Sequence, residues 1–200
     1  MTATLILVRH GEIVRPQDTS NFDGAPLSAR GREEIRFLSN AWPFANPAAM
    51  YASPLRRALE SADVFRERFA VPTTVRPCLR EWAADTSGIP QSDYLALEGR
   101  AWADFDFVPP SGESLRMAEV RGRKCLEAIG RAHDGETVAV MGHGTLFSMV
   151  TCVSLGVRPT AARKASIGFA HAAVLEAGSS LRVVRGFAGY GIKETDTKPL

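Results

Sequence analysis

Leu5-Ile6-Leu7-Val8-Arg9-His10-Gly11-Glu12 is the stretch that decides the fold, because a short apolar run ends abruptly in charged residues and a glycine. The segment Val138–Thr145 repeats the arrangement: Val-Ala-Val-Met is followed by Gly-His-Gly-Thr. Short apolar runs bounded by turn residues are typical of buried strands. In open α/β sheets, ligands bind beyond the carboxyl ends of the parallel strands. The sequence therefore predicts that His10 and His143 lie at such an edge, and the neighbouring arginine favours an anionic ligand.

Short apolar runs alternate with helical patterns along the chain, which predicts βα units and a mostly parallel sheet flanked by helices, an α/β fold. With 200 residues and 45% apolar content, we expect a single domain spanning residues 1–200. Ser28 and Ser53 are expected to cap helices, and Asp134-Gly135 to end one. The expected strands are 5–8, 50–52, 137–141, 169–175 and 181–187, and the expected helices follow Ser28 and Ser53 and cover about 94–102, 114–133 and 145–155.

Composition and charge exclude several classes of protein. The chain carries 24 Lys and Arg against 22 Asp and Glu, without a long basic run, so no nucleic-acid partner is expected. The first apolar run is too short for a signal peptide or a membrane span, so no membrane partner is expected either. Three widely spaced cysteines, Cys78, Cys125 and Cys152, fit neither a disulfide framework nor a zinc ribbon. They predict reduced thiols in a cytoplasmic protein.

Arg56 and Arg57 fall in the first turn of the helix expected after Ser53. The helix macrodipole already concentrates positive charge there, so two cations are unfavourable. An anion bound at this helix end would resolve the conflict. Alternatively, both arginines could reach solvent or pair with Glu60 or Asp63, and the segment alone leaves the two readings open.

Further motifs follow in a characteristic order between the two histidines. Together with the first stretch, they resemble the histidine phosphatase superfamily, also called phosphoglycerate-mutase-like, over roughly Leu5 to Phe147. This resemblance implies a three-layer sandwich with a mostly parallel central sheet. The segments that carry it are Leu7–Glu12, Asp23–Gly31, Ser53–Ala58, Leu79–Glu81, Ser111–Ser114 and Val140–Gly144.

The resemblance also implies a role for each matching side chain. His10 would be the nucleophile that forms a phosphohistidine intermediate, which water then hydrolyses. Arg9 and Arg57 would clamp the phosphoryl oxygens, because guanidinium forks match their geometry. His143 would hydrogen-bond the same group as an imidazolium stabilised by the phosphoryl dianion, and Glu81 would be the general acid. Such a site needs no metal and no cofactor.

The loop after His10 departs from the family pattern. Many members have Thr directly after the Glu and Asn three residues later, whereas this chain has Ile13 and Pro16. Another part of the loop must then complete the phosphate site, and its polar side chains are the candidates. Substrate-binding positions are therefore expected at Arg9, Arg57, His143, Gly144, Arg15 and Asn21, with Gln17 and Ser20 as alternatives in the loop. The usual Gly-x-Trp-Glu-Gly stretch after the acid is also missing, which leaves the substrate open.

The sequence thus predicts a metal-independent phosphatase of small phosphorylated metabolites, a histidine acid phosphatase-type phosphomonoester hydrolase. Three alternatives stay open: a mutase-type phosphoryl transferase, a protein-phosphohistidine phosphatase, and a module that binds a phosphorylated ligand without turnover. A metal hydrolase built on His10, His143 and Glu81 lacks the usual ligand motifs. His133 and His171 receive no role, and the oligomeric state is open, a homodimer included.

Overall fold

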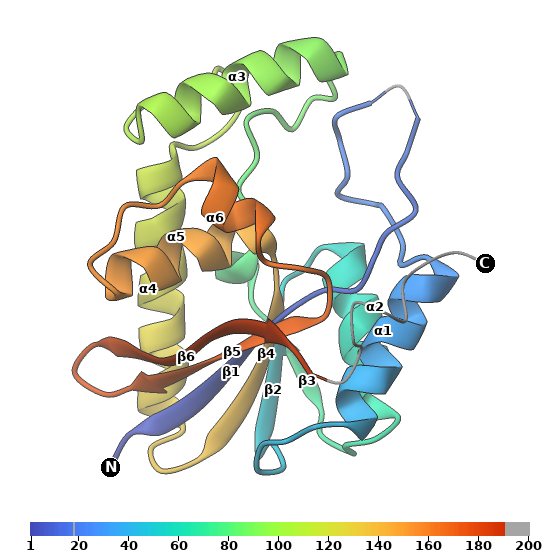
Figure 1. Ribbon diagram of the computed structural model, residues 1–200, viewed down its shortest axis with the longest axis vertical. Helices are drawn as coiled ribbons and strands as arrows, with labels where there is room; N and C mark the ends of the chain where they lie inside the picture. Colours follow the sequence, from blue (N-terminus) through green and yellow to red (C-terminus); the bar gives the residue numbers. More distant parts are fainter. Residues whose placement is uncertain (18, 191–200) are drawn as a thin grey trace.

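The computed structural model, in which residues 1–17 and 19–190 are described, contains a six-stranded sheet with the strand order β3-β2-β4-β1-β5-β6 (Figure 1). Four strands run parallel: β1 (Ala3–Arg9), β2 (Ala49–Ala52), β3 (Thr73–Val75) and β4 (Thr137–Gly142). The last two, β5 (His171–Ala177) and β6 (Leu181–Gly189), add an antiparallel edge beside β1. The predicted α/β class with a mostly parallel sheet is confirmed.

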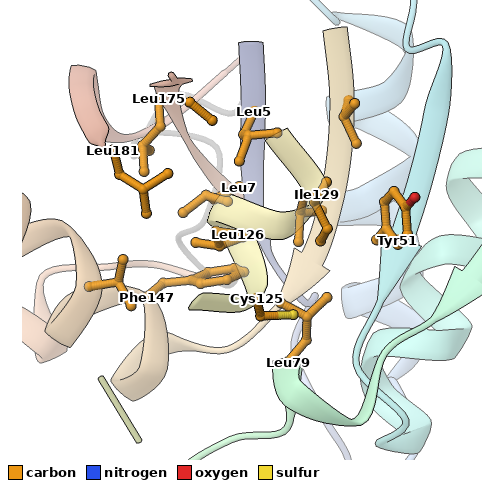
Figure 2. Packing of buried hydrophobic residues seen from close by; sticks show 14 of the residues in the cluster. Leu5, Leu7, Tyr51, Leu79, Cys125, Leu126, Ile129, Phe147, Leu175 and Leu181 are labelled. Atoms are coloured by element: carbon orange, nitrogen blue, oxygen red, sulfur yellow. The ribbon is translucent and has the colours of Figure 1, made fainter. Parts of the chain in front are cut away.

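Helices cover both faces of this sheet and make three layers (Figure 1). The helices α1 (Ala29–Asn40) and α2 (Arg56–Arg66) lie on one face, and α4 (Leu115–Ala132) and α5 (Gly144–Ser154) on the other. Because successive side chains of a strand point to opposite faces of the sheet, β1 contributes side chains to the hydrophobic cores on both faces. Ile6 and Val8 pack with the first helix pair, whereas Leu5 and Leu7 pack with Leu126 and Phe147 of the second (Figure 2).

A smaller group of elements lies beyond the carboxyl edge of the central strands. It comprises the short 3-10 helix η1 (Pro77–Leu79), α3 (Gln91–Ala103) and α6 (Ala161–Ala165). Figure 1 shows α3 and α6 above the edge at which β1 and β4 end. A third apolar cluster, which includes Trp82, Ala101, Leu115 and Leu146, fixes α3 against α4 and α5.

Strand register decides which loops meet at that edge. Arg9 at the end of β1 pairs with Gly142 at the end of β4, so the next residues, His10 and His143, leave the sheet side by side. The backbone N–H of His10 donates to Gly142 O over 3.0 Å. On the other side of β4, Ser53 N donates to Met141 O over 3.0 Å. Three chain segments far apart in the sequence therefore converge at one place.

Most of the expected elements are confirmed within a few residues. Ser28 caps α1, where its hydroxyl accepts a hydrogen bond from Gly31 N, and α4 ends before Asp134-Gly135. The predicted cap at Ser53 is wrong: α2 begins at Arg56 after Leu55, and its N-cap has no side-chain hydrogen bond. The α6 helix was not predicted from the sequence, because it has only five residues and none is buried.

The prediction of reduced thiols is wrong for two of the three cysteines. Cys78 in η1 and Cys125 in α4 form a disulfide with a Cα–Cα distance of 5.9 Å, and Cys152 is free and buried. The two cysteines are 47 residues apart in the sequence, and their sulfurs meet because η1 packs on α4. The spacing of the cysteines alone therefore does not predict this pairing. No helix in the described part of the chain is long and apolar enough to cross a membrane. The cytoplasmic location and the single domain stay predictions.

Candidate active site

His10 and His143 lie next to each other at the carboxyl ends of β1 and β4. Their ring centroids are 5.3 Å apart, at an interplanar angle of 60°. The His10 ring is buried to 5% exposure and His143 is fully buried. The strand register that pairs Arg9 with Gly142 accounts for this proximity.

His10 has one ring nitrogen engaged and one available. Its Nδ1 lies 2.7 Å from the carbonyl oxygen of Gly11. Because a carbonyl can only accept a hydrogen bond, Nδ1 carries the proton and Nε2 keeps its lone pair. Burial, together with the positive charge of Arg57, holds the pKa of His10 well below 6.5. The ring is therefore a neutral imidazole with a free nucleophilic nitrogen at neutral pH.

His143 is held at both ring nitrogens. Nδ1 accepts a hydrogen bond from Nε of Arg57 at 3.3 Å, so the proton resides on Nε2, which lies 2.7 Å from Oγ of Ser53. Burial lowers the pKa of His143 well below 6.5, with smaller contributions from the charge of Arg57 and from His10. The imidazolium expected from the sequence therefore does not describe the free protein, and a proton would have to arrive with a bound dianion.

Arg57 and its neighbour Arg56 behave differently, although both begin α2. Arg56 is exposed and forms an ion pair with Glu60 at 2.7 Å, as the second reading of this segment expected. Arg57 is only 6% exposed and donates to His143 and to the carbonyl of Phe22. Burial lowers the pKa of its guanidinium, and the charges of Glu81 and Asp23 offset part of this effect, although no carboxylate within the described residues lies close enough to form a salt bridge with it. A buried cation without a salt-bridge partner favours the binding of an anionic ligand.

Arg9 also has unused hydrogen-bonding capacity. Its Nη1 donates to the carbonyl of Ile167, and its guanidinium carbon lies 4.2 Å from the ring centroid of Phe169. Its Nε is buried and has no hydrogen-bond partner in the described part of the chain. A Cβ on Gly144 would stand 3.3 Å from that nitrogen, so the glycine lets the guanidinium lie against the start of α5. Burial lowers the pKa of Arg9 as well.

Glu81 lies at the same edge, on the segment that follows η1. Its carboxylate accepts hydrogen bonds from the backbone N–H groups of Thr145 (2.9 Å), Leu146 (2.8 Å) and Trp82 (3.0 Å). Two of these donors belong to the first turn of α5, whose N-terminal end favours negative charge. The helix that begins after His143 is thereby tied to Glu81.

These side chains surround a cavity of about 260 Å³. Of the residues predicted from the sequence, Arg9, His10, Arg57, Glu81, Gly144 and Arg15 line it. His143 lies behind His10 and does not line the cavity. Asn21 lines a smaller neighbouring hollow, where its side chain bonds the backbone of Asp23 and Thr86. The remaining lining residues are Ile13, Phe22, Trp82, Gln91, Tyr94, Leu95, Glu98, Thr145, Lys164 and Phe169.

Sequence reasoning missed the outer wall of this cavity. Lys164 of α6 and Glu98 of α3 form an ion pair of 3.6 Å across the two helices. Burial raises the pKa of Tyr94 to about 12, so its hydroxyl stays a hydrogen-bond donor. Neither helix position carries a motif, and only the fold brings them to the cavity. The sequence predicts Ser53 as a helix cap, whereas in the structure its hydroxyl is the hydrogen-bond partner of His143.

Potential metal ligands do not cluster here. Within residues 1–17 and 19–190, no group of three or more His, Cys, Asp and Glu side chains could hold a metal ion. What converges instead is the guanidinium groups of Arg9 and Arg57, the imidazole of His10 and the carboxylate of Glu81 at the cavity, with the imidazole of His143 beside that of His10.

One protein-family model matches most of this chain. The family model described as histidine phosphatase superfamily (branch 1) matches residues 5–187. A metal-independent phosphoserine phosphatase from Arabidopsis thaliana is 26% identical over 155 residues, which are 70% of this chain and 63% of that protein. The chain thus spans less than two thirds of the length of this relative.

Solved structures agree in fold. YhfR from Bacillus stearothermophilus has a TM-score of 0.76 at 24% identity, covering 92% of this chain and 96% of that one. A mycobacterial glucosyl-3-phosphoglycerate phosphatase has a TM-score of 0.73 at 21% identity, covering 96% and 100%. At these identities the structural likeness concerns the fold alone.

Proposed function

Since this chain belongs to branch 1 of the histidine phosphatase superfamily, we propose that it is a metal-independent phosphatase acting on small phosphorylated metabolites. In this proposal the reaction passes through a phosphohistidine on His10. The relative from Arabidopsis thaliana, named a metal-independent phosphoserine phosphatase, supports the reaction class. The proposed substrate is a class of compounds, namely phosphomonoesters small enough to reach His10 through the cavity.

The observation that carries the proposal is the unpaired hydrogen-bonding capacity of two arginines, Arg57 buried and Arg9 partly buried, in front of a neutral histidine. Arg9 has a buried Nε without a partner among the described residues, and Arg57 has no carboxylate partner there. Burying a cation costs free energy unless an anion accompanies it. A phosphoryl group supplies the charge and the oxygen acceptors that both guanidinium groups need.

In the first step, the lone pair of His10 Nε2 attacks phosphorus while the bond between phosphorus and the ester oxygen breaks. Gly11 holds the ring through the Nδ1 proton, so the attacking nitrogen is oriented before substrate binds. Arg9 and Arg57 stabilise the charge on the phosphoryl oxygens. In this proposal Glu81 takes up a proton when the negatively charged phosphate binds beside it, and donates that proton to the departing oxygen, which leaves as an alcohol.

In the second step, water attacks the phosphorus of phospho-His10 and the nitrogen–phosphorus bond breaks. The Glu81 carboxylate takes the proton of the attacking water, which restores the acid for the next cycle. Inorganic phosphate and neutral His10 are the products. His143 accepts the hydrogen bond of Arg57 while its ring is neutral, and a proton taken up on Nδ1 in the presence of the dianion would replace that bond.

The test is hydrolysis of p-nitrophenyl phosphate by purified protein in EDTA, with His10→Ala as the variant. We expect kcat to fall by at least about a thousand-fold, because the nucleophile is removed. His133→Ala, which alters a histidine at the end of α4 that lies outside the cavity, is the matched control and should keep activity. Full activity of His10→Ala would refute the proposal. Binding of vanadate without hydrolysis of any phosphomonoester would instead favour a binding module.

A further inference from the structure

Glu81 lies on a segment that has no regular structure of its own, since η1 ends at Leu79 and Arg80 is its C-cap. A general acid acts only when its proton is within hydrogen-bond reach of the leaving oxygen. The segment must therefore be held from outside. We propose that Arg121 of α4 is a positioning residue that sets the location of Glu81, an inference that rests on the proposed phosphatase function.

The guanidinium of Arg121 contacts the backbone immediately before the acid. Its Nη1 donates to the carbonyl oxygen of Cys78 over 2.7 Å and to that of Arg80 over 2.9 Å. The second of these carbonyls belongs to the peptide bond that leads into Glu81. Both hydrogen bonds come from a charged donor, which makes them stronger than bonds between neutral groups.

The same guanidinium is fixed by Glu113. Arg121 Nε donates to one carboxylate oxygen of Glu113 over 3.2 Å, and Nη2 donates to the other. This is a two-bond pairing of guanidinium and carboxylate, and both side chains are only about a quarter exposed, at 25% and 26%. The ion pair thus fixes the direction in which Nη1 points.

Glu113 also holds the chain after the acid. Its backbone carbonyl accepts a 2.7 Å hydrogen bond from Nε1 of Trp82, whose side chain is 2% exposed. The residues before Glu81 therefore connect to the side chain of Arg121, and Trp82 after it connects to the backbone of Glu113, whose carboxylate binds Arg121. Glu81 lies between the two attachment points.

The disulfide holds a different part of the same segment. Cys125 lies one turn after Arg121 on α4 and bonds Cys78, three residues before the acid. Figure 2 shows Cys125 beside Leu79 in the apolar core. The covalent link secures the start of the segment to α4, whereas the guanidinium secures the carbonyl directly before Glu81.

Lysine cannot reproduce this arrangement, although it would keep the charge. The guanidinium uses a planar fork to bond two carbonyls and two carboxylate oxygens at once. An ammonium has three donors on a flexible stem and does not match a carboxylate with two parallel bonds. Arg121→Lys therefore keeps the net charge and loosens the Glu81 segment.

Loss of position at Glu81 has a selective chemical consequence. An alkyl oxygen needs a proton to leave, whereas p-nitrophenolate is a weak base that leaves without one. A displaced general acid should therefore lower kcat/KM for alkyl phosphates and spare kcat/KM for p-nitrophenyl phosphate, because kcat/KM covers only the steps up to departure of the ester oxygen. The later hydrolysis of phospho-His10, in which Glu81 is the base, is common to both esters and enters kcat alone. Damage to the fold or to the phosphate site would slow both esters equally.

The experiment compares kcat/KM of Arg121→Lys for p-nitrophenyl phosphate and for an alkyl monophosphate hydrolysed by the wild-type protein. We expect kcat/KM for the alkyl ester to fall at least about tenfold, and kcat/KM for the aryl ester to change less than about threefold, as a displaced acid requires. Glu81→Gln should show the same selectivity with a larger effect, on the order of a hundredfold on the alkyl ester.

Arg123→Lys is the matched control, since Arg123 lies on the same helix and pairs with Glu119 and Glu127 away from the acid. This variant should hydrolyse both esters like the wild type. Equal loss of both activities in Arg121→Lys, or no loss of either, would overturn the positioning role. Wild-type protein that hydrolyses neither ester would overturn the proposed function, and the inference with it.

Discussion

Single hydrogen bonds decide what each of the two site histidines can do. The Gly11 carbonyl fixes the Nδ1 proton of His10 and leaves Nε2 free, whereas Arg57 and Ser53 occupy both nitrogens of His143. The two motifs look alike in the sequence because both place His after a buried strand and before Gly. Their different roles come from partners elsewhere in the chain, and Ser53 is 90 positions from His143.

Removing the Ser53 hydroxyl should weaken the site through His143. In Ser53→Ala the Nε2 proton of a fully buried ring loses its acceptor, which costs about 1–3 kcal/mol of unfolding free energy. The ring can then turn away from Arg57, and we expect kcat for p-nitrophenyl phosphate to fall about tenfold, as a loss of about 1.4 kcal/mol in transition-state stabilisation predicts. Denaturant unfolding and steady-state kinetics measure the two effects.

Ser148→Ala is the control for this variant. Ser148 is equally buried, but its hydroxyl has no hydrogen-bond partner within the described residues. Replacing it should leave stability unchanged or slightly higher, and leave kcat unchanged. Equal stability and activity of Ser53→Ala and Ser148→Ala would show that the Ser53 hydroxyl does not support His143.

At the residue scale, a motif in the sequence indicates which side chain of a segment turns inward, whereas a single polar residue in a loop carries no such signal. The resemblance assigns the phosphate-binding role to Arg57 within the segment Ser53–Ala58, and the structure buries Arg57 while Arg56 faces solvent. Asn21 was proposed because of its polarity, yet its side chain completes the local turn instead of lining the main cavity. A polar side chain in a loop has many local backbone partners, and the sequence does not tell which it takes.

At the scale of elements, the loop after β1 is clamped to α1 by a close contact between two glycines. A Cβ on Gly31 would lie 2.0 Å from the carbonyl oxygen of Glu12, and one on Gly11 would lie 2.2 Å from the Gly31 carbonyl. Glu12 is also bonded through its N–H to Glu34 of α1 at 2.9 Å. The backbone that carries His10 is therefore placed by the first turn of α1.

Gly31→Ala should separate these two elements. Alanine favours a helix by about 1 kcal/mol over glycine, but contact with a backbone oxygen costs about 1–3 kcal/mol or more, so the variant should be less stable. The loop would shift His10, and kcat should fall with it. Gly99→Ala is the matched control, because a Cβ there, within α3, meets no atom within 4 Å. It should raise stability by about 0.5–1 kcal/mol, and equal changes in both variants would contradict the clamp.

Elements with their own apolar face could be predicted from the sequence, and elements fixed by neighbours could not. The α4 helix has a regular buried stripe that includes Leu115, Leu126 and Ile129, and its position was predicted closely. The α6 helix has no buried residue, yet its Lys164 reaches the cavity. Likewise, the pairing of Cys78 with Cys125 depends on how η1 packs on α4, which no local pattern reveals.

At the scale of the whole molecule, the sheet order gathers the site from segments that the sequence keeps apart. The neighbouring strands β2, β4 and β1 end at one edge and deliver Ser53, His143 and His10 there. The sequence predicted a parallel sheet but not the order of its strands, because order depends on long-range pairing. The result is a site in which burial, helped by the charges of Arg57 and Arg9, lowers the pKa values of two histidines and keeps both rings neutral.

This arrangement predicts that the stability of the whole protein depends on pH. Burial, with the charge of Arg57, holds the pKa values of His10 and His143 well below 6.5, the value each regains when the chain unfolds. Below pH 6.5 the unfolded chain therefore binds more protons than the folded one, so the free energy of unfolding falls as pH falls toward the folded pKa values. Each histidine contributes a slope of up to about 1.4 kcal/mol per pH unit, and nothing above about pH 7.5.

Urea unfolding of wild-type protein and of His10→Asn between pH 7.5 and 5.5 measures this slope. Asparagine does not titrate, so the free energy of unfolding should fall less steeply with decreasing pH in the variant. The difference in slope should be up to about 1.4 kcal/mol per pH unit, the contribution of one proton. The comparison uses slopes rather than absolute stabilities, because the substitution itself changes packing at the site. Parallel curves for the two proteins would mean that His10 takes up a proton in the folded protein as readily as in the unfolded chain. The neutral nucleophile would then be lost in the same pH range, and kcat/KM at subsaturating p-nitrophenyl phosphate should fall with it below pH 6.5.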